Sequence, residues 1–138
     1  MLCGRIDEHD RCRYVRVGGL FQRTSDPHTD TLDNLLGQGE IIIGDLILTE
    51  VLQGFRYERH LRQALVLLQA FPIVTMLGPT LAVRSAEHYR TLRARGVTVR
   101  KTIDVMIGTY CIARNLPLLY VDRDFDPLVR HLGLRTVL

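Results

Sequence analysis

The chain has 138 residues, of which 46% are hydrophobic and 24% are charged. This length and composition are typical of one globular domain that buries a hydrophobic core without disulfides to support it. No apolar run approaches the roughly 18 residues of a membrane span, and no signal-peptide pattern is present. We therefore expect a single domain over residues 1–138, with no membrane association and no export.

The net charge of +3 is compatible with a polyanionic partner, although it is weak evidence for one. Lys101 is the only lysine, so 18 − 1 = 17 of the basic residues are arginine. A GC-rich coding sequence is the simpler explanation of that excess, and phosphate recognition by guanidinium groups is the other. Cys3, Cys12 and Cys111 form no CxxC pair, which indicates reduced thiols in a cytoplasmic protein.

The first half of the chain predicts helices alternating with strands. Asp30 can cap a short helix that ends at Gly37, and the β-branched run 41–43 predicts a buried strand. Residues 73–77, directly after Pro72, also read as a strand. Two helices lie between these strands, each with apolar residues at i, i+3, i+4 and i+7: Leu48, Val51, Leu52 and Phe55, then Leu61, Ala64, Leu65 and Leu68.

The second half continues the alternation. A helix is expected over 81–95, with Ala82, Ala86 and Tyr89 on one face. Thr102 should cap the next helix, which we expect to bury Ile103, Ile107 and Tyr110. The remaining elements are a strand over 118–121, a short helix from Asp124 or Asp126 through His131 with Gly133 after it, and a strand over 134–137.

Strands that alternate with helices predict an α/β fold in three layers, with helices on both faces of a parallel central sheet. In such folds, binding sites form beyond the carboxyl ends of the strands. That rule directs attention to the acidic residues that follow predicted strands.

Three carboxylates occupy suitable positions. Glu50 lies on the helix after the strand 41–43, Asp104 lies in the first turn of a helix, and Asp122 directly follows the strand 118–121. Carboxylate oxygens are the ligands that magnesium and manganese prefer, and clustered carboxylates repel one another unless a cation neutralises them. Gly108, four residues after Asp104, is expected to leave room for a ligand. The set therefore predicts a divalent metal site.

Each acid has a simpler explanation when taken alone. Asp104 would favour any helix N-terminus through the helix dipole, and Glu50 would be an ordinary solvated helix residue. Asp122 and Asp124 would be turn residues, and Asp126 a helix cap. The ordered set is more specific than any of its members.

From Thr29 to Val137 the chain resembles the PIN-domain nucleases, and within them the VapC toxins of bacterial toxin–antitoxin pairs. The segments that carry this resemblance are Ile43–Gly54 (IGDLILTEVLQG), Arg100–Asp104 (RKTID) and Asp122–Asp126 (DRDFD). They occur in the family order and at family-like spacing.

The resemblance implies a PIN-like α/β domain that cuts RNA with Mg²⁺ or Mn²⁺ and is held inactive by a cognate antitoxin. Glu50, Asp104 and Asp122 would be the catalytic metal ligands, with Asp124 as an additional candidate. Arg100 and Lys101 lie beside Asp104 and would hold the RNA backbone, although a solvated basic turn explains the pair equally well. The family habit of pairing also implies a homodimer.

The N-terminal segment departs from the family pattern, which opens with an apolar strand that ends in the first metal-binding aspartate. Residues 1–28 contain no such strand, and Asp7 and Asp10 do not end an apolar run. Arg11, Arg13 and Arg16 would also be costly to bury in a central strand. We therefore expect the first strand to be atypical or disrupted.

A shifted reading frame explains this departure. Codons permitted for His9 through Thr24, read one nucleotide later, can encode Met-Ile-Val-Val-Asp-Thr-Ser-Val-Trp-Val-Asp-Tyr-Phe-Asn-Gly. That reading is a family-style opening, with the missing aspartate encoded across Arg13 and Tyr14. Our hypothesis is a frame shift, by a paired mutation or a sequence error, that is restored near Thr24.

Two functions follow from the sequence. The first is an active metal-dependent endoribonuclease toxin. The alternative is a catalytically impaired PIN-domain remnant that retains antitoxin or RNA binding. A different acid-pocket α/β domain, such as a receiver or a small phosphatase, is disfavoured because the DxDxT motif of such phosphatases is absent.

Overall fold

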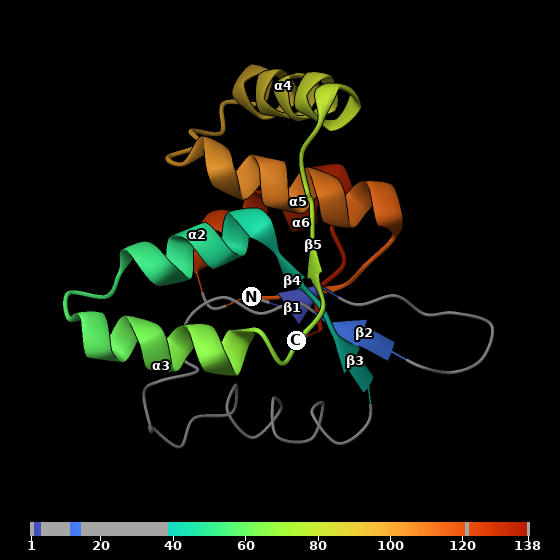
Figure 1. The fold of residues 1–138 in the computed structure, drawn as a ribbon. Coiled ribbons are helices and arrows are strands. Elements are labelled where there is room, and N and C mark those ends of the chain that lie inside the picture. The colour runs from blue at the N-terminus through green and yellow to red at the C-terminus, as the bar shows by residue number, and fades with distance from the viewer. Residues whose placement is uncertain (1, 4–11, 15–38, 121, 138) are drawn as a thin grey trace.

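The computed structural model describes residues 2–3, 12–14, 39–120 and 122–137 (Figure 1). The predicted helix over 30–37 and most of the atypical N-terminal segment lie outside these ranges. The strands are β1 (Leu2–Cys3), β2 (Cys12–Tyr14), β3 (Gly39–Ile41), β4 (Ile43–Gly44), β5 (Ile73–Val74) and β6 (Leu118–Leu119). The helices are α2 (Asp45–Gln53), α3 (Glu58–Leu68), α4 (Pro79–Ala94), α5 (Thr102–Arg114), the 3-10 helix η1 (Arg123–Phe125) and α6 (Asp126–Leu132).

Parallel pairing joins the strands around the β-branched run. β2 pairs with β3, and β4 pairs with β5, with Ile43 opposite Ile73. The predicted strand 41–43 is therefore divided between two parallel pairs. β6 pairs antiparallel with β1 and makes a parallel bridge from Leu118 to Thr136. The antiparallel pair involves the N-terminal segment, for which the sequence predicts an atypical strand.

Helices cover the strands in layers. In Figure 1 the strands lie between α3 on one side and α5 on the other, and α4 packs on the outer side of α5. The core between these elements is aliphatic and aromatic, and its largest fully buried members include Ile43, Ile47, Leu68, Met76, Leu92, Ile107, Leu118 and Phe125. The expected α/β architecture is confirmed. None of the described helices is long and apolar enough to cross a membrane.

The two long helices of the second half differ in burial. α5 buries seven of its thirteen residues, whereas α4 buries only two of sixteen, Ser85 and Leu92. The predicted face of α4 is partly wrong, because Ala82 and Ala86 are exposed and Tyr89 is only half-buried. Small residues define an apolar face weakly, so the bulkier Leu92 decides which side packs on α5.

Most of the remaining predicted elements agree with the structure apart from their ends, but the predicted strand over 134–137 is reduced to a single parallel bridge at Thr136. α3 packs through Ala64 and Leu68 as expected, whereas Phe55 lies beyond the end of α2. Thr102 is the first residue of α5 and not its cap; the cap position belongs to Lys101, whose carbonyl accepts from the Asp104 N–H at 3.2 Å. Gly133 ends α6 at a φ of 76°, a conformation that glycine adopts without strain.

Candidate metal centre

Asp104 is placed by the most buried helix of the described chain. It lies in the first turn of α5 and is 2% exposed. Its Oδ2 is buried and has no hydrogen-bond partner among the described residues. A buried carboxylate oxygen without a partner is costly in a folded protein, so it indicates a missing ligand or a catalytic role.

Asp122 and Asp124 are placed by the loop after β6. Asp122 caps η1, because its Oδ1 accepts a hydrogen bond of 3.0 Å from the backbone N–H of Asp124. Tyr120 also holds this loop in place. Its hydroxyl donates a hydrogen bond of 2.9 Å to Asp126 Oδ1, and the centroid of its ring lies 5.3 Å from the centroid of the Phe125 ring. These contacts hold both acids at the carboxyl end of β6.

The three aspartates converge on one point. One carboxylate oxygen from each of Asp104, Asp122 and Asp124 lies within 4.8 Å of the other two. We call these residues the aspartate cluster. Oxygen atoms this close together can share a single cation, and carboxylates are the donors that hard divalent ions prefer. The buried, unpartnered Oδ2 of Asp104 supports the same fit.

Glu50 lies at the edge of the aspartate cluster and outside the 4.8 Å group. It is half-buried on α2. Burial raises the pKa of Glu50, and the negative charge of Asp122 raises it further. The fold therefore brings Glu50 close enough to the cluster for their charges to interact, since Glu50 also raises the pKa of Asp104.

The electrostatics of the cluster depend mainly on Asp104. Burial raises the pKa of Asp104 to about 6, and the negative charge of Glu50 contributes to the increase. The pKa of Asp122 shifts the other way, because the backbone N–H of Asp124 and the ammonium of Lys101 stabilise its charged form. Near neutral pH the cluster is negative, and Asp104 bears its charge in the least solvated position.

The basic residues expected to hold RNA lie beside the cluster. Lys101 Nζ forms an ion pair of 3.2 Å with Asp122 Oδ2. Arg100 is exposed, and its positive charge also lowers the pKa of Asp122. The sequence predicts both as phosphate contacts, but it does not predict the ion pair, because 21 residues separate Lys101 from Asp122.

Gly108 has a different role from the one that its spacing predicted. A Cβ atom there would overlap Leu128 Cδ2, so the missing side chain lets α5 approach α6 closely. It does not open space for a ligand. Spacing from Asp104 could not distinguish these roles, because the face toward α6 depends on tertiary packing.

Asp45 is a structural residue that the sequence did not single out. Its Oδ1 accepts from the backbone N–H groups of Leu46, at 2.8 Å, and Met76, at 3.0 Å. These bonds tie the start of α2 to the segment after β5, and so they fix the helix that carries Glu50. The signal available in the sequence was an acidic residue at a helix start, directly after a glycine.

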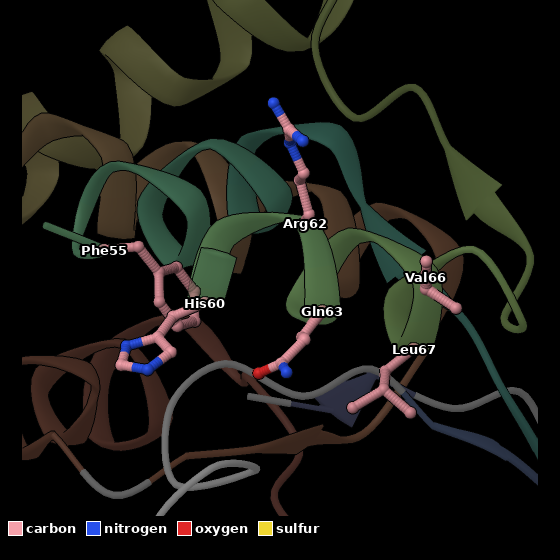
Figure 2. A pocket seen from close by; sticks show the side chains of 6 residues that line it. All are labelled: Phe55, His60, Arg62, Gln63, Val66 and Leu67. Carbon is pink, nitrogen blue, oxygen red and sulfur yellow. The ribbon is translucent and has the colours of Figure 1, made fainter. Parts of the chain in front are cut away.

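A hollow with a volume of about 820 Å³ lies elsewhere, along α3. Gln63 and Leu67 extend from one side of the helix in Figure 2, and Arg62 extends from the opposite side. None of the lining residues belongs to the aspartate cluster: Phe55, His60, Arg62, Gln63, Val66 and Leu67. This hollow is therefore not part of the candidate metal centre.

A family model described as the PIN domain matches residues 19–129. The match covers most of the chain and includes all four candidate ligands, so the chain belongs to the PIN-domain family. The matched range begins at Gly19, and most of the segment that departs from the family pattern lies before it.

The fold is also similar to a solved structure, described as VapBC2 from Rickettsia felis bound to a DNA fragment from their promoter. The TM-score is 0.63 at 20% sequence identity, and the match covers 78% of this chain and 81% of that chain. At this identity the likeness establishes the shared fold, and it agrees with the PIN assignment.

Proposed function

We propose that this protein is a Mg²⁺- or Mn²⁺-dependent endoribonuclease toxin of the VapC type. The observation that carries the proposal is the convergence of Asp104, Asp122 and Asp124 within 4.8 Å, with the buried Asp104 Oδ2 unpartnered. PIN domains are generally metal-dependent nucleases, and this chain has an acidic group suited to such an ion.

Each residue has an assigned part in this proposal. Asp104, Asp122 and Glu50 hold the metal, and Asp124 adds a further carboxylate. A bound Mg²⁺ supplies an activated water and stabilises negative charge that develops on the phosphate. Arg100 and Lys101 bind the RNA backbone beside the cluster and fix the position of the scissile phosphate.

The structural neighbour suggests the partner. Its description names a VapBC assembly on promoter DNA, and we extend this to the present chain as a cognate antitoxin partner. We also propose a homodimer that acts in the cytoplasm, where RNA substrates and reduced thiols occur together. The buried, free Cys111 is consistent with that compartment.

A specific observation supports the alternative, an impaired remnant that binds antitoxin or RNA without cutting. The chain lacks the apolar strand and aspartate with which the family opens, and the family match begins only at Gly19. A site with one ligand fewer binds metal more weakly. Under this alternative, partner binding persists and cleavage does not.

The test is cleavage of a panel of structured RNAs in Mn²⁺ or Mg²⁺, with and without chelator. Four proteins are compared: the chain as it stands, a version with the alternate-frame N-terminus, and Asp104→Asn and Glu58→Gln in the more active background. Glu58 is a matched control, because it is exposed and its partner within the described part of the chain is Arg62 on the same helix, at 3.2 Å.

The proposal predicts metal-dependent cleavage that chelator and Asp104→Asn abolish and that Glu58→Gln leaves unchanged. Cleavage by the alternate-frame version alone would identify the present chain as the impaired remnant. Equal cleavage by both versions would contradict our account of the N-terminus. Cleavage that survives Asp104→Asn would contradict the assigned site.

A further inference from the structure

Lys101 occupies an unusual position for a residue whose expected role is to bind RNA. Its ammonium lies 3.2 Å from Asp122 Oδ2, while its side chain remains 51% exposed. Because Asp122 belongs to the aspartate cluster, this ion pair places a positive charge directly on one member of the cluster.

The two oxygens of Asp122 are both engaged in the structure. Oδ1 accepts from the Asp124 N–H, and Oδ2 accepts from Lys101. In contrast, Asp104 Oδ2 has no partner among the described residues. A divalent ion held by all three aspartates would therefore meet a vacant oxygen at Asp104 and an ammonium at Asp122.

We propose that Lys101 is an internal counter-cation of the aspartate cluster, which neutralises Asp122 in the metal-free protein and competes with the divalent ion for it. Metal binding releases the ammonium, which is then free to contact the phosphate of the substrate. This inference rests on the metal centre of the proposed function. In addition, it couples metal binding to RNA binding, because Lys101 takes part in both.

Repulsion among the carboxylates is the physical basis of this role. Three carboxylates within 4.8 Å destabilise one another, most strongly where Asp104 is shielded from water. A nearby ammonium offsets that repulsion when no metal is bound. The same ammonium repels an incoming cation, so its removal should strengthen metal binding and weaken the metal-free fold.

Arg100 provides the matched control, because it is adjacent and carries the same charge. It is exposed, and among the described residues no ion pair joins it to the cluster. Arg100→Met and Lys101→Met therefore remove one positive charge each from the same turn, but only Lys101→Met frees Asp122 Oδ2.

The first measurement is calorimetric titration of the full chain and the two variants with Mn²⁺ alone. We expect Lys101→Met to bind Mn²⁺ about three- to fivefold more tightly than the parent, a factor typical of losing one exposed ion pair. Arg100→Met should change the affinity less than about twofold. Equal gains in the two variants, or no gain in Lys101→Met, would overturn the proposal.

The second measurement is thermal unfolding in chelator and in saturating Mn²⁺, which requires no activity. In chelator, Lys101→Met should melt below Arg100→Met, and saturating Mn²⁺ should remove the difference because the ion then neutralises the cluster. Equal melting of the two variants in chelator would overturn the counter-cation role even if Mn²⁺ binding behaved as expected.

These measurements separate the present proposal from the proposed function. Absence of Mn²⁺ binding in all three proteins would overturn the competition and the metal centre together. Mn²⁺ binding that follows the expected order, without RNA cleavage, would support the counter-cation and contradict only the nuclease function.

Discussion

Asp104 and Asp122 belong to one cluster but lie in opposite environments. Asp104 is held by the buried start of α5, and burial raises its pKa to about 6. Asp122 lies on the loop after β6 with its side chain 47% exposed, and hydrogen bonds from Asp124 and Lys101 lower its pKa. The neighbours of Asp122 therefore stabilise its charge overall, whereas burial makes the charge of Asp104 costly in spite of the nearby Lys101.

Because of this difference, the α5 turn and the loop after β6 contribute differently to metal binding. The α5 turn supplies a carboxylate whose charge is costly until a cation arrives, so it makes the larger contribution to metal binding. The loop supplies carboxylates whose negative charge destabilises the metal-free protein little. It also lies close to exposed basic residues.

The largest effect is expected for Asp104→Asn. Cleavage should fall roughly 100-fold or more, equivalent to about 3 kcal/mol of transition-state stabilisation, because the least solvated metal ligand is lost. At neutral pH and without metal, the same change should raise the free energy of unfolding by about 1–3 kcal/mol, because a desolvated charge disappears. Chemical denaturation in chelator and single-turnover cleavage measure the two effects.

Asp122→Asn is the matched comparison for that experiment. It should also weaken metal binding, but it should not stabilise the metal-free protein, because it removes the ion pair with Lys101. If both substitutions raised the free energy of unfolding equally, the contrast between buried and exposed carboxylates would be wrong.

The pH dependence should follow Asp104. Because its pKa is about 6, Mn²⁺ affinity should fall by up to about tenfold per pH unit below that value, as protons compete with the ion. The raised pKa makes the opposite contribution to metal-free stability. That contribution is complete below the ordinary value of 3.8 and is lost as the pH rises through about 6.

Asp122 should have the opposite effect on the pH dependence of stability. Its lowered pKa gives stability that is present above 3.8 and is lost as the pH falls below that value. Melting curves from pH 3 to 8 in chelator, for the parent and Asp104→Asn, separate the two groups. If Asp104→Asn melted with the same pH profile as the parent, Asp104 would not be the group that titrates with a raised pKa.

Gly108→Ala tests the rigidity of the helix that presents Asp104. The added Cβ would overlap the end of the fully buried Leu128 side chain, so this side chain must repack or α6 must shift, which should lower the free energy of unfolding by about 1–3 kcal/mol. Gly54→Ala is the control, since its nearest new contact is the Val51 carbonyl oxygen at 3.5 Å. Comparable destabilisation of the two variants would contradict close packing at Gly108.

The smallest effect is expected for Tyr120→Phe, on the loop side. It removes the 2.9 Å hydrogen bond to Asp126, which should lower the free energy of unfolding by about 1 kcal/mol. Because the aspartate cluster keeps its own contacts, Mn²⁺ affinity should change little. A large loss of affinity would show that the loop depends on this bond more than the structure indicates.

The sequence predicted much of the fold because its helices carry strong apolar periodicity. α3 packs through Ala64 and Leu68, and α5 buries Ile107 and Tyr110 as predicted, whereas Ile103 is only half-buried. The buried face of α4 was not predicted correctly, because alanines at 82 and 86 carry little apolar surface. The predicted helix over 30–37 lies outside the described residues and stays a prediction.

Three of the four predicted acidic ligands converge in the structure, but the contacts among them and their neighbours could not be predicted. The order of Glu50, Asp104, Asp122 and Asp124 along an α/β pattern was visible, and the fold brings the three aspartates together. The unpartnered Asp104 oxygen depends on packing between segments distant in sequence, and so does the Lys101–Asp122 pair. No local pattern encodes either feature.

The central claim is that the aspartate cluster binds a divalent ion. The most direct measurement is the anomalous difference map of crystals of the full chain grown or soaked in Mn²⁺. We predict one peak bounded by carboxylate oxygens of Asp104, Asp122 and Asp124, with Lys101 moved away from Asp122. A map without a peak at the cluster, from crystals with millimolar Mn²⁺ and an accessible site, would contradict the account.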